Sequence, residues 1–389
     1  MRRTSVIARI SALSLVALSL ACGQDETDRS VTIENIGGVT YVKNPKQGPW
    51  DSGGASRLRL VRDLQIGKLT GEDEFLFVYI SDVAVDGEGD IYVGDRQLNE
   101  VRKYDREGRH LRTIGRKGQG PGEFQSIRTV SVNPLNELVV FDNMAGRISV
   151  FSDRGEHKET TKKLLAGSWI EPCEIFSGNN GYILFGKANG SPDLFHVFDA
   201  GWNETDSYIR YEASGDKEFE EQSLGFHPGN CCFRKNGDIL YTKYYHDNQM
   251  RVYADRKLTQ VWARDSDIKN AYEVQVYHDV NKAMSVPRDQ DYDFKSFGPG
   301  IAFIGKSFQN SLGVFQMPDL RIVNFLSVRA SRTRRELWAE LYDPTGKLLS
   351  FSKLGDDVSY DIRCMDSGGR FYAVERKDFN KVIAFRLEY

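Results

Sequence analysis

The sequence predicts an all-β fold made of repeated units of four short strands. The clearest sign lies between Ser81 and Gly155. DGEGDIYVGD begins at Asp86 and VRKYDREG follows from Val101; 47 residues later the pattern returns as NPLNELVVFD from Asn133 and ISVFSDRG from Ile148, without a gap. A fixed period of this size, with several short strands per unit, is typical of the blades of a β-propeller.

The first two units can be divided into strands at their turns. The segments DGEG at 86–89 and DREG at 105–108 have the composition of hairpin turns and lie between alternating apolar stretches. The expected strands are Ser81–Asp86, Asp90–Asp95, Glu100–Asp105 and Arg109–Gly115 in the first unit, and Thr129–Asn133, Glu137–Asp142, Arg147–Ser152 and His157–Lys163 in the second.

Four more units can be traced in weaker form, so the prediction is a six-bladed propeller. Their marker segments are Gly181–Gly186 with Leu194–Asp199, Asn236–Tyr241 with Met250–Tyr253, Ile301–Ile304 with Leu337–Gly346, and Ile362–Glu375 with Val382–Phe385. A helix is expected only within the insertion Asp265–Asp293, since no other stretch has a helical period.

The sixth unit ends after its third strand, because the sequence stops at Tyr389. An open sheet edge there would be unfavourable. The N-terminal segment Leu58–Leu64 alternates between apolar and polar residues, as a strand with one buried face does. We therefore expect this segment to form the outermost strand of the last blade and to close the ring.

The repeat also resembles a known family. VAVDGEGDIYVGD at 83–95, Tyr104-Asp105 and IGRKGQGPGEF at 114–124 are similar to NHL-repeat propellers and, more closely, to six-bladed β-propeller lipoproteins of bacteria. The resemblance is strong over 80–155 and at the C-terminus and weaker over 200–340. It implies a propeller at the cell envelope and says little about chemistry.

The first 22 residues are expected to direct export. Arg2 and Arg3 precede the apolar run Ile10–Ala21, which is too short to span a bilayer and fits a signal peptide. LSLAC, ending at Cys22, resembles the lipobox of bacterial lipoproteins, although Ser19 stands where that family usually has Leu. Cys22 would carry the lipid, 23–30 would be a polar tether and 31–389 the propeller; ordinary secretion with cleavage at Ala21 is the alternative.

Charge and cysteine usage limit the function further. A net charge of −3, from 52 basic and 55 acidic residues, gives no basis for binding nucleic acid. Cys232 and Cys364 occupy a repeat position that favours small residues, so we interpret them as packing thiols. A Cys173–Cys231 disulfide is conceivable, and the spacing of the thiols is not that of a zinc site.

The face formed by the loops after each second strand and between blades, here called the loop face, is the expected binding surface. These loops are longer and less regular than the opposite turns, and such loops tend to carry function. Their basic side chains would attract an acidic glycan, lipid head group or protein patch, whereas ordinary solvated charge is the alternative. The predicted binding residues are Arg96, Arg116, Lys117, Arg128, Asn143, Lys187, Tyr245, His246 and Arg376.

Asp95 and Asp142 end the second strand of each clear unit. Because an active site would not require the same residue twice, we expect these two carboxylates to cap loops.

The sequence therefore favours a lipid-anchored binding module of the bacterial envelope, with a protein or anionic glycan as partner, no catalytic residues and no required cofactor. The alternative is a metal-dependent lactonase or other hydrolase, since six-bladed propellers of similar shape include lactonases. Calcium or magnesium would then be held in the central funnel by oxygen ligands, from Asp82, Glu171, Asn230 and Asp361. A structural subunit of an envelope assembly is the third possibility, and the oligomeric state is left open.

Overall fold

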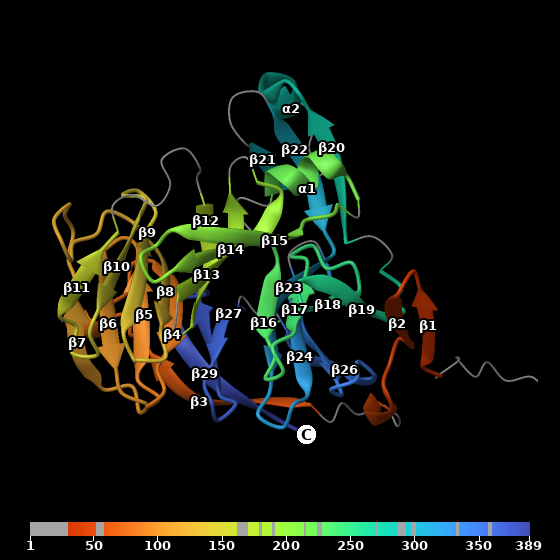
Figure 1. Cartoon of the computed structure of the whole chain (residues 1–389), viewed down its shortest axis with the longest axis horizontal. Coiled ribbons are helices and arrows are strands. Elements are labelled where there is room, and N and C mark those ends of the chain that lie inside the picture. The colour runs from red at the N-terminus through yellow and green to blue at the C-terminus, as the bar shows by residue number, and fades with distance from the viewer. Residues whose placement is uncertain are drawn as a thin grey trace, which may run out of the picture.

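The computed structural model describes residues 30–51, 58–161, 170–178, 181–188, 191–213, 215–223, 228–268, 271–285, 293–296, 301–331, 334–356 and 360–389. Six blades of four antiparallel strands form a β-propeller, one of them within a six-stranded sheet, and a smaller three-stranded sheet stands on one side of the ring (Figure 1). The predicted six-bladed fold is confirmed.

Each blade runs from an inner strand, which faces the central axis, to an outer one. Blade one is β4 (Ile80–Val85), β5 (Ile91–Asp95), β6 (Glu100–Tyr104) and β7 (His110–Ile114); blade two is β8 (Ile127–Val132), β9 (Leu138–Asp142), β10 (Arg147–Phe151) and β11 (His157–Thr160); blade three is β12 (Ile170–Gly178), β13 (Gly181–Ala188), β14 (Asp193–Asp199) and β15 (Glu204–Arg210).

The other three blades follow the same order. Blade four is β16 (Asn230–Phe233), β17 (Ile239–Thr242), β18 (Gln249–Ala254) and β19 (Lys257–Arg264); blade five is β23 (Gln309–Gln316), β24 (Ile322–Arg329), β25 (Arg335–Tyr342) and β26 (Leu348–Asp356); blade six is β27 (Tyr360–Met365), β28 (Phe371–Glu375), β29 (Lys381–Glu388) and β3 (Arg59–Ile66).

The ring closes through β3, as predicted. This N-terminal strand pairs antiparallel with the C-terminal strand β29, from Ile66 opposite Val382 to Arg59 opposite Glu388. The last blade therefore combines the two ends of the propeller segment. With β3 as its fourth strand, it is a complete blade.

The fifth blade differs from the prediction. The segment Ile301–Ile304, which we assigned to that blade, lies in and just before β22 (Ala302–Ser307) of the small sheet, where β22 pairs with β20 (Tyr272–Tyr277) and β21 (Asp293–Ser296). The blade itself begins later, at β23. The inserted strands alternate in the same way as blade strands, so the pattern alone did not separate them.

Two helices lie beside this insertion. Helix α2 (Val280–Ser285) falls inside the predicted helical region, whereas α1 (Lys217–Ser223), between blades three and four, was not predicted. Both lie with the small sheet on one side of the ring (Figure 1). No helix among the described residues is long and apolar enough to cross a membrane.

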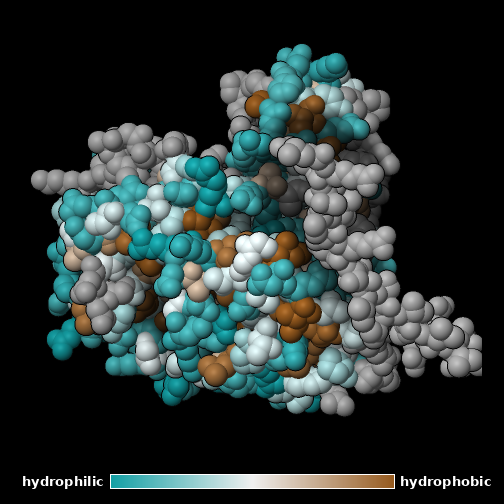
Figure 2. All heavy atoms as spheres, turned by 45° about the vertical axis from the view of Figure 1, so that its right-hand side comes forward, coloured by the Kyte–Doolittle hydropathy of each residue, from teal (hydrophilic) through white to brown (hydrophobic). Residues whose placement is uncertain are grey.

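The N-terminal hairpin enlarges blade four. Strand β2 (Val39–Asn44) pairs parallel with β19, and β1 (Thr32–Ile36) forms the outer edge of the resulting six-stranded sheet. Ile33 and Ile36 on β1 are exposed. On the face shown in Figure 2, hydrophobic residues are likewise exposed in small groups among hydrophilic ones.

The hydrophobic core is divided among the contacts between blades. Each pair of neighbouring blades shares its own cluster of buried apolar side chains, such as Ile66, Ile80 and Val374 between blades six and one. Because every cluster draws on two blades, no blade buries its apolar faces alone, and closure of the ring completes the last interface.

Candidate functional site

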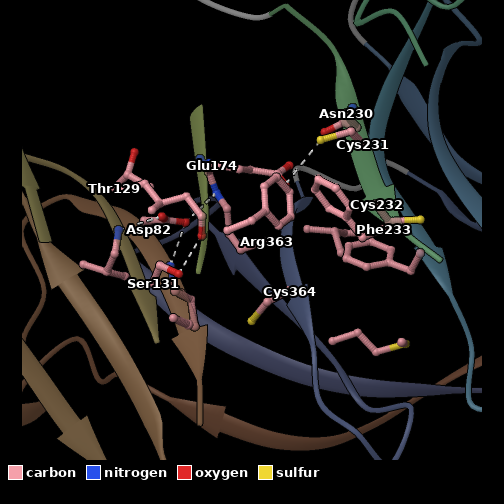
Figure 3. Close-up of a pocket in the computed structure, with 18 of the residues that line it drawn as sticks. Asp82, Thr129, Ser131, Glu174, Asn230, Cys231, Cys232, Phe233, Arg363 and Cys364 are labelled. Carbon is pink, nitrogen blue, oxygen red and sulfur yellow. Dashed lines mark hydrogen bonds and ion pairs between the residues drawn. The ribbon is translucent and has the colours of Figure 1, made fainter. Parts of the chain in front are cut away.

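A central channel is the largest cavity described. Its volume is about 1190 Å³, and its walls are the inner strands β4, β8, β12, β16, β23 and β27 (Figure 3). Tyr244 and Arg376, from loops on the loop face, also line it, whereas Met365 lies at the other end of inner strand β27 and Gly181 at the start of β13. The channel therefore extends along the propeller axis and involves the loop face.

The same backbone irregularity recurs along the channel wall. In five blades the register between the inner strand and its neighbour shifts by one residue, at Ile80/Asp82, Ile127/Thr129, Pro172/Glu174, Ser311/Gly313 and Ile362/Cys364. A β-bulge of this kind bends the strand and redirects its side chains. Asp82, Thr129 and Glu174 are therefore equivalent positions of successive blades, and all three occur in the wall near its charged groups.

Charged side chains gather where the inner strands begin. Arg363 forms an ion pair with Asp361, and its Nε lies 4.0 Å from Oδ1 of Asp82. Arg376 Nη1 lies 3.3 Å from Asp361 Oδ2, and its Nη2 donates a hydrogen bond of 2.8 Å to the carbonyl of Ile80. Asp361 is thus neutralised by two arginines that come from different parts of blade six.

Asp82 links blades one and two. Its two carboxylate oxygens accept hydrogen bonds of 2.9 Å from the backbone N–H groups of Val83 and Val130. Burial raises the pKa of Asp82 to about 6, although Arg363 and the two N–H groups favour the charged form. At neutral pH this side chain is therefore mostly ionised.

Glu174 on β12 lies close to Asp82 and Arg363 and contacts the next blade. Cys231 Sγ is 3.9 Å from its Oε2, a contact that joins blades three and four. Burial, followed by the nearby charge of Asp82, raises the pKa of Glu174 to about 8. Figure 3 shows Asp82, Glu174 and Arg363 close together on one side of the cavity.

Further polar side chains connect inner strands. Ser131 Oγ donates a hydrogen bond of 2.7 Å to the carbonyl of Ile175, and Asn230 Nδ2 donates one of 3.0 Å to the carbonyl of Ser311. These side chains add to backbone hydrogen bonds between neighbouring blades, such as the one of 2.8 Å from the N–H of Ser311 to the carbonyl of Tyr244. Part of the polar character of the channel is therefore structural.

The thiols in the wall do not have the environment of reactive cysteines. Cys232 and Cys364 are free thiols. The conceivable Cys173–Cys231 disulfide involves Cys173, whose side chain lies outside the described part of the structure. Burial raises the pKa of Cys232 to about 12, with a smaller contribution from Glu174, and burial also raises the pKa of Cys364. Both thiols therefore stay protonated at neutral pH, as packing residues do.

The predicted metal ligands are only partly placed. Asp82, Asn230 and Asp361 line the channel, whereas the side chain of Glu171 lies outside the described part of the structure. Within the described residues, no three side chains of His, Cys, Asp or Glu are grouped so that they could hold a metal ion. The lactonase hypothesis gains no support from these positions, and the metal site stays a prediction.

A comparison with known protein families shows to which family the chain belongs. Residues 62–297, more than half of the sequence, match the family described as "Domain of unknown function (DUF4934)". The chain belongs to this family. A comparison with curated proteins finds no match.

Solved structures share the fold of this DUF4934 protein at low identity. A member of the DUF4221 family from Bacteroides vulgatus is 12% identical with a TM-score of 0.55, over 85% of this chain and 98% of that one. A protein from Bacteroides fragilis, described as a predicted exported protein, is 10% identical with a TM-score of 0.54, over 90% and 100%. Virginiamycin B lyase from Staphylococcus aureus, at 10% identity over 85% and 99%, has a TM-score of only 0.46.

The basic residues predicted for the loop face of the DUF4934 protein mostly have partners. Arg116 Nη2 lies 2.8 Å from Glu123 Oε1, and Arg96 Nε donates a hydrogen bond of 2.9 Å to Ser126 Oγ. Lys117 is exposed, Arg128 and Asn143 are half-buried, and the side chain of Lys187 lies outside the described part. Of this group, Arg376 lines the channel.

Two of the predicted binding residues, Tyr245 and His246, are buried, which corrects the expectation that they lie on the binding surface. Tyr245 is only 8% exposed and packs between Phe219 of α1 and Tyr272 of β20, with ring centroids 5.1 Å from each. His246 is 1% exposed, and its Nε2 lies 3.2 Å from Oε2 of buried Glu340. Helix α1 and the insertion cover this loop.

Sequence reasoning missed two residues of the site, Glu174 and Arg363. In blade three we selected Glu171 only because it lies near the start of the inner strand. The register places Glu174, not Glu171, at the position equivalent to Asp82. An alignment of the inner strands on the residue after the bulge would have identified Glu174.

Proposed function

We propose that this DUF4934 protein is a binding module of the bacterial cell envelope, attached through a lipid on Cys22, and that it binds an envelope glycan at the loop-face mouth of its central channel. The envelope location is supported by the export signal and lipobox-like ending of 1–22. The similarity to a Bacteroides fragilis protein described as predicted to be exported agrees with it.

The channel is the observation that carries the binding proposal. Ligand pockets typically have volumes of about 300–1,000 Å³ with largely apolar walls and a few polar groups. At about 1190 Å³, this cavity is slightly larger, and its wall combines apolar side chains such as Val130, Phe176 and Phe315 with the charged group around Asp361. A short oligomer fits these dimensions better than a single small metabolite.

An aromatic side chain at the mouth favours a sugar. Tyr79 is 45% exposed, and the guanidinium of Arg376, which lines the channel, lies 5.2 Å from the centre of its ring. The arginine fixes one face of the ring by a cation–π contact. An exposed ring held in place beside polar groups provides a flat surface on which a sugar ring can stack.

Binding of the full-length protein, purified in detergent, to an array of immobilised oligosaccharides tests this function. We expect Tyr79→Ala to weaken binding about tenfold and Leu111→Ala to leave it unchanged, since Leu111 is exposed to the same 45% but lies on outer strand β7. Absence of glycan binding, or equal losses in both variants, would refute the glycan site. Crosslinking to an envelope protein through position 79 would then identify a protein partner instead.

A further inference from the structure

Glu174 differs from the other carboxylates of the channel in its partners. Asp361 has two arginines, and Asp82 has two backbone N–H groups and Arg363. Among the residues that the structure describes, Glu174 forms no ion pair, and its hydrogen-bond partner is the thiol of Cys231. A thiol is a weak donor and neutralises no charge.

The groups around Glu174 come from several inner strands. Asp82 on β4 brings a like charge, Arg363 on β27 brings an opposite charge that it shares with Asp82 and Asp361, and the thiols are Cys231 and Cys232 on β16 and Cys364 on β27. A buried carboxyl beside a carboxylate, with the neighbouring Arg363 already paired, is most stable in its protonated form. The raised pKa of about 8 agrees with this geometry.

A protonated Glu174 changes the chemistry that the channel offers. A neutral carboxyl group has an O–H donor, which a carboxylate lacks. It also balances the charge of the mouth, because Arg363 and Arg376 are then matched by the ionised Asp82 and Asp361. A site without net charge, with donors and acceptors side by side, does not select an ion. It suits an uncharged ligand rich in hydroxyl groups.

We propose that the channel binds an uncharged oligosaccharide, and that Glu174 donates its carboxyl proton in a hydrogen bond to a hydroxyl or ring oxygen of that ligand. This inference rests on the proposed function, to which it adds the class of glycan and the residue that recognises it. It departs from the anionic partner expected from the basic loop residues, because three of them, Arg96, Arg116 and Arg376, are paired with a carboxylate or hydroxyl of the protein.

The test is the affinity for uncharged oligosaccharides as a function of pH. Hexamers of glucose, mannose and N-acetylglucosamine, with a galacturonate hexamer as the charged comparison, are titrated calorimetrically into full-length protein between pH 7 and 9.5. We expect an uncharged hexamer to bind and its affinity to fall roughly tenfold for each pH unit above about 8, as Glu174 loses its proton. Asp82 titrates below this window, and Cys232 above it.

Two substitutions identify the group that titrates. Glu174→Gln keeps an N–H donor that cannot ionise, so we expect affinity within about threefold of the wild type at pH 7 and no decrease toward pH 9.5. Glu174→Ala removes the donor, so we expect it to bind at least about tenfold more weakly than the wild type does at pH 7, with no further change toward pH 9.5. Glu159→Gln on outer strand β11 is the control and should behave as the wild type. Melting temperatures at pH 7 confirm that each variant is folded.

Each contrary result points to a different failure. If an uncharged hexamer binds in a Tyr79-dependent manner but Glu174→Gln is as weak as Glu174→Ala, or wild-type binding does not change with pH, the role of Glu174 is wrong and the binding function stands. If the galacturonate hexamer is preferred, the ligand is anionic and the uncharged class is wrong. If no hexamer binds, both proposals are overturned.

Discussion

At the residue scale, Asp95 shows how one repeated side chain organises the backbone around it. Its carboxylate accepts hydrogen bonds from the N–H groups of Val78, Tyr79, Gln97 and Leu98, at 2.8–3.3 Å. Asp142 does the same for Gln125, Ser126 and Ala145 in the next blade. The prediction that both residues cap loops is confirmed.

The cap should contribute measurably to stability. Asp95→Ala would leave several partly buried N–H groups without this acceptor, so we expect the free energy of unfolding in urea to fall by about 1–3 kcal/mol. Asp153→Ala, at an exposed turn position, should change it by less than about 0.5 kcal/mol. Equal effects of the two substitutions would contradict the assigned role of the cap.

Glu174 should also make stability depend on pH. Its pKa of about 8 in the folded state lies above the value of about 4.3 for an unfolded chain, so the folded state holds this proton more tightly. The free energy of unfolding therefore falls as pH rises between these values. We expect Glu174→Gln to gain stability relative to the wild type from pH 5 to pH 8 and to gain nothing further above pH 8. Parallel urea unfolding series at each pH measure the difference; a difference that stays constant with pH would show that Glu174 is ionised throughout.

Single residues could be predicted where the repeat supplied a second copy. Asp95 and Asp142 are equivalent in two blades, and that equivalence alone identified their role. Tyr245 and His246 occur once, in a loop whose exposure depends on α1 and on strands more than twenty residues further along the chain. Burial by a distant insertion leaves no mark on the loop sequence itself, so these two residues were assigned wrongly.

At the scale of elements, one face of the closing strand β3 should contribute most of its stabilising contacts. Ile66 is 1% exposed and packs in the cluster between blades six and one, whereas Val61 on the same strand is 38% exposed. We expect Ile66→Ala to lower the free energy of unfolding by about 2–4 kcal/mol and Val61→Ala by less than about 1 kcal/mol. Similar losses measured by urea unfolding would indicate that strand pairing, not this interface, stabilises the closure.

The elements that could be predicted are those with clear turn chemistry. Blade one was divided correctly because DGEG and DREG mark its hairpins, and blade two followed from the repeat 47 residues later. Strand β3 was found from alternation together with the missing fourth strand. Strand β22 was assigned to the wrong sheet because an alternating pattern specifies a half-buried strand and not its neighbours. The parallel pairing of β2 with β19 was also beyond prediction, since its partners are separated by more than two hundred residues.

At the scale of the whole molecule, the channel is a property of the closed ring. Its charged group combines Asp82 near the start of the propeller with Arg363 and Arg376 near its end, and Glu174 comes from blade three. No local stretch of sequence contains two of these strands, so the pairing of Arg363 with Asp82 could not be read from spacing. The fold was predictable because the repeat recurs along the chain. The site was not, because its residues differ from one blade to the next.

Attachment to the membrane is the whole-molecule prediction. If a lipid on Cys22 holds the protein at the envelope, Cys22→Ser should move it from the membrane pellet to the soluble fraction after cell lysis and high-speed centrifugation, because a thioether-linked lipid requires the cysteine sulfur. Cys364→Ser is the matched control: it removes a thiol from the channel wall and should leave the protein in the pellet. Retention of the Cys22→Ser protein in a carbonate-washed pellet would refute lipid anchoring. Release of both variants would instead show that the folded propeller holds the protein at the membrane, and that either substitution disturbs those contacts.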